Sequence, residues 1–214
     1  VHLLGYLVDP AYDPLAAELA KARDSRVTRL ERMVALLAAD GIPLTYAAVL
    51  AQVPPGATPG RPHIADALVA AGVVGSRDEA FERWLHDDSP YYVHHYAPDP
   101  LRAVELVRAA GGVAVLAHPF ATTRGAVILA DEVISHLADA GLGGIEADHP
   151  DHDEAARARA RALATRLGLF VTGSSDYHGS GKTTRLGDNL TDPVVLTALE
   201  RAGSGSAIIR PASH

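Results

Sequence analysis

Apolar residues recur along the chain with two different spacings. Between about residues 13 and 88 they lie three and four positions apart, as in "LAAELAKARDSRVTRLERMVALLAAD", and this spacing predicts helices. Short apolar runs predict buried strands, first "HLLGYLV" and then, beyond residue 99, "VAVLAHP", "GGIEADHP" and "LFVTGSSD". The chain therefore divides into one short strand, a helical block and a region of alternating elements.

The helical block, residues 13–98, is predicted to hold several helices. The first one ends at the break "GIP", residues 41–43, and shorter helices follow at "LTYAAVLAQV", "IADALVAAG" and "RDEAFERWL". The segment "PPGATPGRPH", residues 54–63, is rich in proline and glycine and predicts an irregular loop. We expect this block to form a helical subdomain inserted after a strand formed by residues 1–12.

Residues 99–203 alternate between helix and strand. The predicted helices are "LRAVELVRAAGG", "ADEVISHLADAG" and "EAARARARALATRLG", and each precedes one of the three later strands. This order implies an α/β fold with a parallel sheet or a barrel. In such folds functional side chains collect at the carboxyl ends of the strands. Residues 204–214 are predicted to form a tail.

Polar residues stand at the ends of all three of these strands. They are His118, the pair Asp148-His149, and the pair Asp176 and His178. Residues i and i+2 of an extended chain point to the same side, so Asp176 and His178 are expected to face one spot. Imidazole and carboxylate are the usual ligands of Zn, Mn or Fe where thiolates are absent. Paired cations favour hydrolysis of phosphoesters, so the pattern predicts a metal-dependent hydrolase.

Composition narrows the function further. A net charge of −7 disfavours binding to duplex DNA, because any nucleic acid would have to be held by a local cluster of cations. The chain has no cysteine, which excludes disulfides, thiolate metal sites and cysteine nucleophiles. No apolar run approaches the roughly 20 residues of a membrane span. We therefore expect a cytoplasmic protein that does not bind membranes.

Other basic side chains are candidates for binding a phosphate group. Arg61 and His63 lie in "GRPH". The planar guanidinium of Arg61 could bind a phosphate group, and an exposed loop arginine without a ligand is the alternative. Arg124 follows the strand of "VAVLAHP", and Lys182 lies in a glycine-rich loop after "GSSDYHG". His152 and the acids of "DHPDHDE" are expected to cap the next helix, whose N-terminus favours negative charge.

The features "VHLLGY", "GRPH", "VAVLAHP", "GIEADHPDH" and "GSSDYHG" together resemble the PHP family, the polymerase and histidinol phosphatase superfamily of metal-dependent phosphoesterases. The resemblance spans roughly residues 1 to 190. Within the family the chain is most similar to bacterial members that carry a helical insertion and act on nucleoside 3′,5′-bisphosphates or, as exonucleases, on the 5′ ends of short RNA.

The resemblance implies the C-terminal part of a distorted (β/α)7 barrel with an inserted helical subdomain. It implies up to three divalent metal ions, Mn, Zn or Fe, with His2, His118, Asp176 and His178 as ligands. His149 matches no ligand of the family, and we place it as a contact either of a ligand side chain or of the substrate. The family's opening His-x-His, its second motif and its glutamate find no counterpart here, so we expect the chain to begin inside the family's domain.

The resemblance also implies an activity for the complete protein. It is hydrolysis of a phosphomonoester of nucleoside 3′,5′-bisphosphates or of short 5′-phosphorylated RNA by a water that the metals activate. Arg61, Arg124 and Lys182 are expected to neutralise the phosphoryl oxygens. Two alternatives stay open, a phosphatase of the histidinol-phosphate type or for another small ester, and a metal-binding domain without catalysis. The oligomeric state is left open too.

Overall fold

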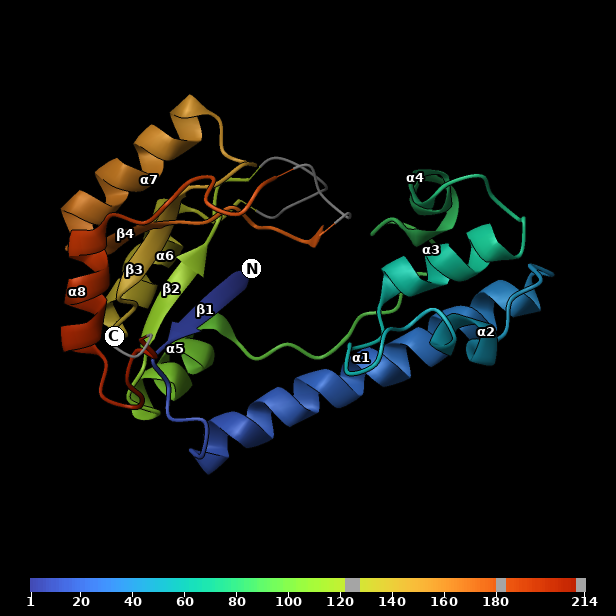
Figure 1. Ribbon diagram of the computed structural model, residues 1–214, viewed down its shortest axis with the longest axis horizontal. Helices are drawn as coiled ribbons and strands as arrows, with labels where there is room; N and C mark the ends of the chain where they lie inside the picture. Colours follow the sequence, from blue (N-terminus) through green and yellow to red (C-terminus); the bar gives the residue numbers. More distant parts are fainter. Residues whose placement is uncertain (122–127, 180–183, 211–214) are drawn as a thin grey trace. The chain divides into compact units, whose positions relative to one another are not determined.

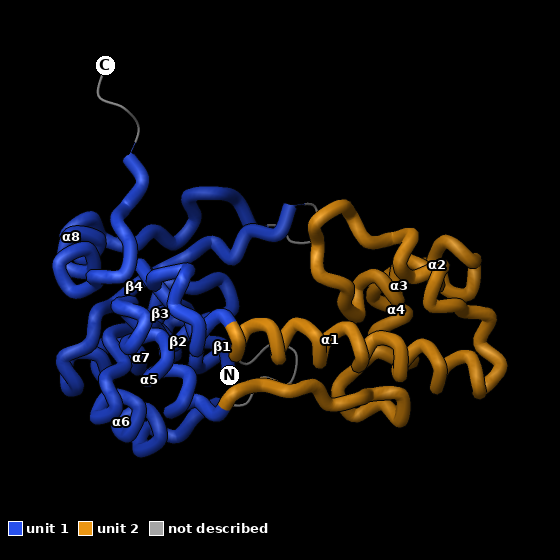
Figure 2. The backbone as a smooth tube through the Cα atoms, turned by 90° about the horizontal axis from the view of Figure 1, so that it is seen from below, with its two compact units in different colours: residues 1–16, 99–214 blue, residues 17–98 orange. Residues whose placement is uncertain are grey.

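The computed structural model describes residues 1–121, 128–179 and 184–210 of the chain, which fold as two compact units. Unit 1 comprises residues 1–16 and 99–214, and unit 2 comprises residues 17–98 (Figure 2). Within the described ranges no helix combines the length and the apolar character needed to cross a bilayer. Arg124 and Lys182 lie outside the described residues.

Unit 1 is built on a four-stranded sheet in the order β1-β2-β3-β4 (Figure 1). The strands are β1 (His2–Tyr6), β2 (Val113–Ala117), β3 (Gly144–Asp148) and β4 (Phe170–Gly173). β2, β3 and β4 run parallel, as the alternating pattern predicts, whereas β1 runs antiparallel to β2. The sequence pattern does not predict the direction of β1, because a whole helical unit and not a single crossover helix joins β1 to β2. The mixed α/β class is confirmed.

Helices cover both faces of this sheet. They are α5 (Pro100–Ala109), α6 (Asp131–Asp139), α7 (Glu154–Leu167) and α8 (Pro193–Ala202). One core joins α5, α6 and α7 to the sheet through buried residues such as Val104, Ile134 and Leu163. On the other face Leu199 of α8 packs with Val113 and Val115 of β2. Burial on both faces is the usual setting of parallel strands.

Helix α8 is an element that the sequence analysis did not assign. Its start follows ordinary rules, since the Asp192 carboxylate accepts a hydrogen bond from Val194 N and Pro193 occupies the first turn. Residues 204–206 then hydrogen-bond to the backbone of Leu7 and Gly111. Gly205 has to be glycine here, because a Cβ atom would lie 2.2 Å from the carbonyl oxygen of Ala110. The first residues of the predicted tail are therefore anchored to unit 1.

All assigned elements of unit 2 are helical. Helix α1 (Asp13–Ala39) begins in unit 1 and continues into unit 2, where α2 (Tyr46–Leu50), α3 (Arg61–Ala70) and α4 (Arg77–Ala80) follow. A single π-helical turn, η1 (Phe81–Leu85), continues α4. The core of this unit consists of aliphatic side chains, among them Leu30, Met33, Leu37, Val49, Ile64 and Leu68. Unit 2 thus has a hydrophobic core of its own.

The predicted loop at residues 54–63 is wrong at its end. Helix α3 starts at Arg61, with Gly60 as the N-cap residue and Pro62 in the first turn. His63 turns back, and its Nδ1 accepts a hydrogen bond from Gly60 N at 3.0 Å. Proline suits the first helical turn because a backbone N–H at this position would have no partner within the helix. The proline and glycine that suggested a loop therefore mark the beginning of a helix.

Candidate metal centre

The candidate ligands gather at the carboxyl edge of the sheet in unit 1. His118 directly follows β2, His149 directly follows β3, and Asp176 and His178 lie in the segment after β4. His2 begins β1, and because β1 is antiparallel its first residue pairs with Ala117, the last residue of β2. The reversed strand thus brings His2 to the same edge.

His2 and His118 form the closest pair of candidate ligands. His2 Nδ1 lies 3.1 Å from His118 Nε2, and the two rings meet edge to face with centroids 5.0 Å apart. Two ligands that each bind one ion at about 2.1 Å lie roughly 3.0–3.4 Å apart, as geometry requires for angles of about 90–109°. The pair forms a hydrogen bond, and its length also equals the spacing of two neighbouring ligands on one cation.

The backbone of His118 is held in an unusual conformation. Its φ angle is +29°, and its N–H donates to Glu146 Oε2 at 2.9 Å. Its ring lies 4.7 Å from the ring of His149, centroid to centroid. Burial lowers the pKa of His118, while nearby Asp176 opposes this shift. At neutral pH the ring therefore carries a lone pair that can bind a metal.

Asp176 is also held at a positive φ, +46°, and its N–H donates to Ser174 Oγ. The strand β4 ends at Gly173, so the reasoning from an extended chain is wrong: Asp176 and His178 lie in a loop. The two are still close, with His178 Nδ1 at 3.4 Å from Asp176 Oδ1 and at 2.7 Å from the Asp176 carbonyl oxygen. A turn, not strand alternation, brings them together.

A second grouping involves the turn after β3. One ligand atom from each of His149, Asp151 and Asp176 lies within 4.8 Å of the others. His149 is 1% exposed, and burial, together with repulsion from His118, lowers its pKa to about 4. Of the acids expected to cap the next helix, Asp153 does so, because its carboxylate accepts a hydrogen bond from Ala156 N at 2.8 Å, whereas Asp151 does not cap α7.

His152 does not cap the helix either. Its side chain is 4% exposed, with Nδ1 at 2.9 Å from the Ala147 carbonyl oxygen. Its Nε2 accepts a hydrogen bond from Phe120 N at 3.2 Å. Both ring nitrogens of His152 are thus hydrogen-bonded, and the ring connects the turn after β3 to the turn after β2.

Glu146 is a residue of the site that the sequence analysis missed. It is 2% exposed, accepts from His118 N, and also hydrogen-bonds the side chain of Ser174. One carboxylate thus joins the ends of β2, β3 and β4. Burial raises its pKa. An acid inside the apolar run "GGIEADHP" was the signal that could have revealed it.

The predicted phosphate contacts of unit 2 have partners of their own. Arg61 Nη1 donates to the Leu85 carbonyl oxygen at 2.8 Å and to Asp87 Oδ1 at 2.5 Å. Its guanidinium carbon lies 5.3 Å from the ring centroid of Tyr92. His63 accepts from Gly60, as described above. Their role toward a substrate stays a prediction.

The residues of unit 1 suit a divalent cation in their chemistry. Imidazole and carboxylate donors meet at one edge, and the nitrogens of His2 and His118 have the spacing of neighbouring ligands. The backbone N–H of His118 donates to the buried carboxylate of Glu146, which fixes the position of this histidine at the edge of the sheet.

The chain is similar to curated proteins that are named as a phosphatase and an exoribonuclease. A scan against models of known protein families gives no match. The chain is 32% identical over 185 residues, 86% of its length, to the 3′,5′-nucleoside bisphosphate phosphatase of Chromobacterium violaceum, and it spans 65% of that protein. It is 27% identical over 195 residues to the 5′-3′ exoribonuclease Rnm of Escherichia coli, covering 90% of this chain and 65% of that one.

Two solved structures are also similar. A candidate metal-dependent phosphoesterase from Bifidobacterium adolescentis has a TM-score of 0.89 and 39% identity, covering 95% of this chain and 72% of that one. An amidohydrolase from Chromobacterium violaceum with bound sulfate has a TM-score of 0.78 and 30% identity, covering 94% and 72%. The similarity to the phosphoesterase structure, together with the cluster of histidine and aspartate, places the chain in the class of metal-dependent phosphoesterases. Within that class, the chain belongs to the PHP superfamily.

Proposed function

We propose that the whole protein is a metal-dependent hydrolase that cleaves a phosphomonoester of nucleoside 3′,5′-bisphosphates or of short 5′-phosphorylated RNA. The observation that carries the proposal is the meeting of His2, His118 and Asp176 at one sheet edge. Relatives named 3′,5′-nucleoside bisphosphate phosphatase and 5′-3′ exoribonuclease match 86% and 90% of the chain. A cytoplasmic location fits such substrates.

The proposal extends to the architecture and to the metals. The four-stranded sheet would be part of a distorted (β/α)7 barrel, with residues 13–98 as its helical insertion. His2, His118, Asp176 and His178 would hold Mn, Zn or Fe ions, up to three in the whole protein. Bound cations would lower the pKa of a nearby water and neutralise charge on the phosphoryl oxygens.

The chain's own residues would position the ligands and bind the substrate. Glu146 holds the backbone of His118, so the ring of His118 stays at the edge of the sheet. Arg61, His63, Arg124 and Lys182 would bind phosphate oxygens, whose charge an arginine fork or an ammonium group neutralises. His149, which is buried beside Asp176, would contact either the substrate or the side chain of a ligand.

A second candidate is hydrolysis of a small phosphate ester that is not a nucleotide bisphosphate. A phosphoribosyl 1,2-cyclic phosphate 1,2-diphosphodiesterase of Eggerthella lenta is 43% identical over 90 residues, 42% of this chain and 32% of that protein. One fold hosts enzymes for many substrates, so an assay distinguishes the two candidates. A direct comparison of substrates is needed.

The test measures phosphate release from adenosine 3′,5′-bisphosphate with Mn²⁺, in this chain and in the full-length gene product. A 5′-phosphorylated oligoribonucleotide and histidinol phosphate serve as alternative substrates. Asp176→Ala should lose nearly all release, whereas Asp139→Ala, on the exposed side of α6, should keep it. Full activity of Asp176→Ala would refute the assignment of Asp176 as a ligand. Release from histidinol phosphate alone would favour the second candidate, and metal binding without hydrolysis of any substrate would favour a non-catalytic domain.

A further inference from the structure

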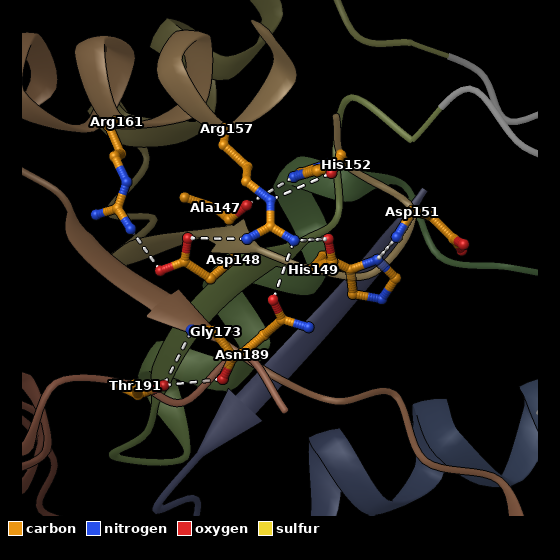
Figure 3. A network of polar contacts seen from close by, with 10 residues as sticks. All are labelled: Ala147, Asp148, His149, Asp151, His152, Arg157, Arg161, Gly173, Asn189 and Thr191. Atoms are coloured by element: carbon orange, nitrogen blue, oxygen red, sulfur yellow. Dashed lines mark hydrogen bonds and ion pairs between the residues drawn. The ribbon is translucent and has the colours of Figure 1, made fainter. Parts of the chain in front are cut away.

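The turn after β3 determines which nitrogen of the His149 ring carries the proton. Asp151 N–H donates to His149 Nδ1 at 3.1 Å (Figure 3). A backbone N–H is always a donor, so His149 Nδ1 must present a lone pair and cannot carry a proton. The ring is therefore neutral with its one proton on Nε2.

The protonated nitrogen of His149 lies next to Asp176. His149 Nε2 is fully buried and makes no hydrogen bond within the described residues, yet it lies 3.5 Å from Asp176 Oδ2. A shift of about 0.5 Å would bring the two atoms to ordinary hydrogen-bond distance. Because a buried N–H without an acceptor is costly, the Asp176 carboxylate is the group that this proton should bind.

Arg157 of α7 keeps the turn in this conformation. Its Nη2 donates to the His149 carbonyl oxygen at 2.9 Å and to Asn189 Oδ1 at 3.0 Å, and its Nε donates to the His152 carbonyl oxygen at 3.2 Å (Figure 3). These bonds hold both sides of Asp151. The direction of the Asp151 N–H, and with it the tautomer of His149, therefore depends on Arg157.

We propose that His149 is a positioning residue that donates its Nε2 proton to the Asp176 carboxylate, with Arg157 fixing the tautomer, and that His149 is not a metal ligand. The inference rests on the proposed function in taking Asp176 as a ligand. The spacing of His149, Asp151 and Asp176 alone would allow His149 to be a third ligand. Binding through Nε2 would move the proton to Nδ1, where it would face the Asp151 N–H.

The first test is nuclear magnetic resonance of the full-length gene product with ¹⁵N-labelled histidine at pH 7, with and without Zn²⁺. Long-range ¹H–¹⁵N correlations identify the tautomer, and the spectrum of His149→Gln assigns the signals. We expect the Nε2–H tautomer under both conditions. An Nδ1–H tautomer without metal, or a switch to it when Zn²⁺ is added, would overturn the proposal.

Arg157 is tested in the same spectra. Arg157→Met should give a mixture of both His149 tautomers, and Arg157→Lys serves as a second variant should the first fail to fold. Arg161→Met is the matched control, since Arg161 lies on the same helix and binds Asp148 at 2.5 Å without an observed bond to a carbonyl group of the turn. A pure Nε2–H tautomer in folded Arg157 variants would refute the role of Arg157.

The second test compares two replacements of His149 by metal titration. A glutamine amide can donate an N–H near the position of Nε2 but is a poor ligand for Zn²⁺ or Mn²⁺, whereas alanine offers neither function. A positioning role predicts unchanged stoichiometry, with affinity reduced about 10–100-fold in His149→Ala and largely restored in His149→Gln. Equal losses in both variants, or one ion fewer, would refute it. Tautomer and metal affinity are read without substrate, so a missing phosphatase activity would contradict the proposed function and not this inference.

Discussion

Replacing Glu146 tests how the site is supported. The Glu146 carboxylate is 2% exposed and accepts the backbone N–H of His118 at 2.9 Å. Glu146→Gln keeps an acceptor oxygen without the charge, whereas Glu146→Leu removes the acceptor and leaves the His118 N–H unpaired. A buried donor left without a partner costs about 1–3 kcal/mol. Ser174 also loses its hydrogen bond to Glu146 in the leucine variant, but this side chain is half-buried and can bind water instead. We therefore expect the leucine variant to be less stable than the glutamine variant by about the cost of the unpaired His118 N–H.

The assay is urea unfolding followed by far-ultraviolet circular dichroism. The single tryptophan, Trp84, lies in unit 2, so its fluorescence reports the unfolding of that unit separately. Glu105→Leu, at a side chain that is 58% exposed, is the matched control and should cost less than about 0.5 kcal/mol. Equal free energies of unfolding for the leucine and glutamine variants would refute the reasoning. Metal affinity, measured in parallel, should fall more in the leucine variant, because His118 loses its anchor.

Three further predictions concern stability. Burial, and then the charge of Arg29, lower the pKa of His95 below its usual 6.5, so the unfolded chain gains this proton first as the pH falls. Unit 2 should therefore lose stability below about pH 6.5, and His95→Gln should weaken this dependence; equal slopes of the urea midpoint, read by Trp84 fluorescence, would contradict it. Leu68→Ala, at a fully buried position of the same unit, should cost about 2–5 kcal/mol in that assay, and a loss below about 1 kcal/mol would mean that the core closes around the change. Gly168→Ala, at a φ of +67° after α7, should cost about 1 kcal/mol in thermal unfolding, and an unchanged midpoint would show that the helix end adapts.

The sequence predicts the fold where local patterns decide it. Apolar spacing locates the long helix α1 and the strands β2, β3 and β4, and the Gly168 cap falls where α7 should end. It does not predict the direction of β1, because strand pairing depends on contacts between residues far apart in sequence. Proline and glycine occur both in loops and in the first turn of a helix, which explains why α3 starts at Arg61, three residues before its apolar pattern begins.

The site is predictable in its residue types and not in its internal geometry. Strand ends followed by histidine or aspartate indicate the edge where His118 and Asp176 lie. The roles of Glu146 and of the Asp151 N–H depend on burial and on hydrogen bonds across three strands, and single-strand patterns carry no such information. The comparison with relatives supports the superfamily, while the assignment of each ligand stays a prediction.

The antiparallel pairing of β1 with β2 has a consequence for synthesis on the ribosome. His2 and His118 lie 116 positions apart in sequence, with all of unit 2 between them. The helices of unit 2 make local contacts and can form as they leave the ribosome, whereas β1 must wait for its partner strand. During this interval the apolar strand "HLLGY" has an unpaired edge, the kind of surface that chaperones shield from aggregation. Slow translation of the helical unit should therefore lower the yield of folded protein more than slow translation after β2.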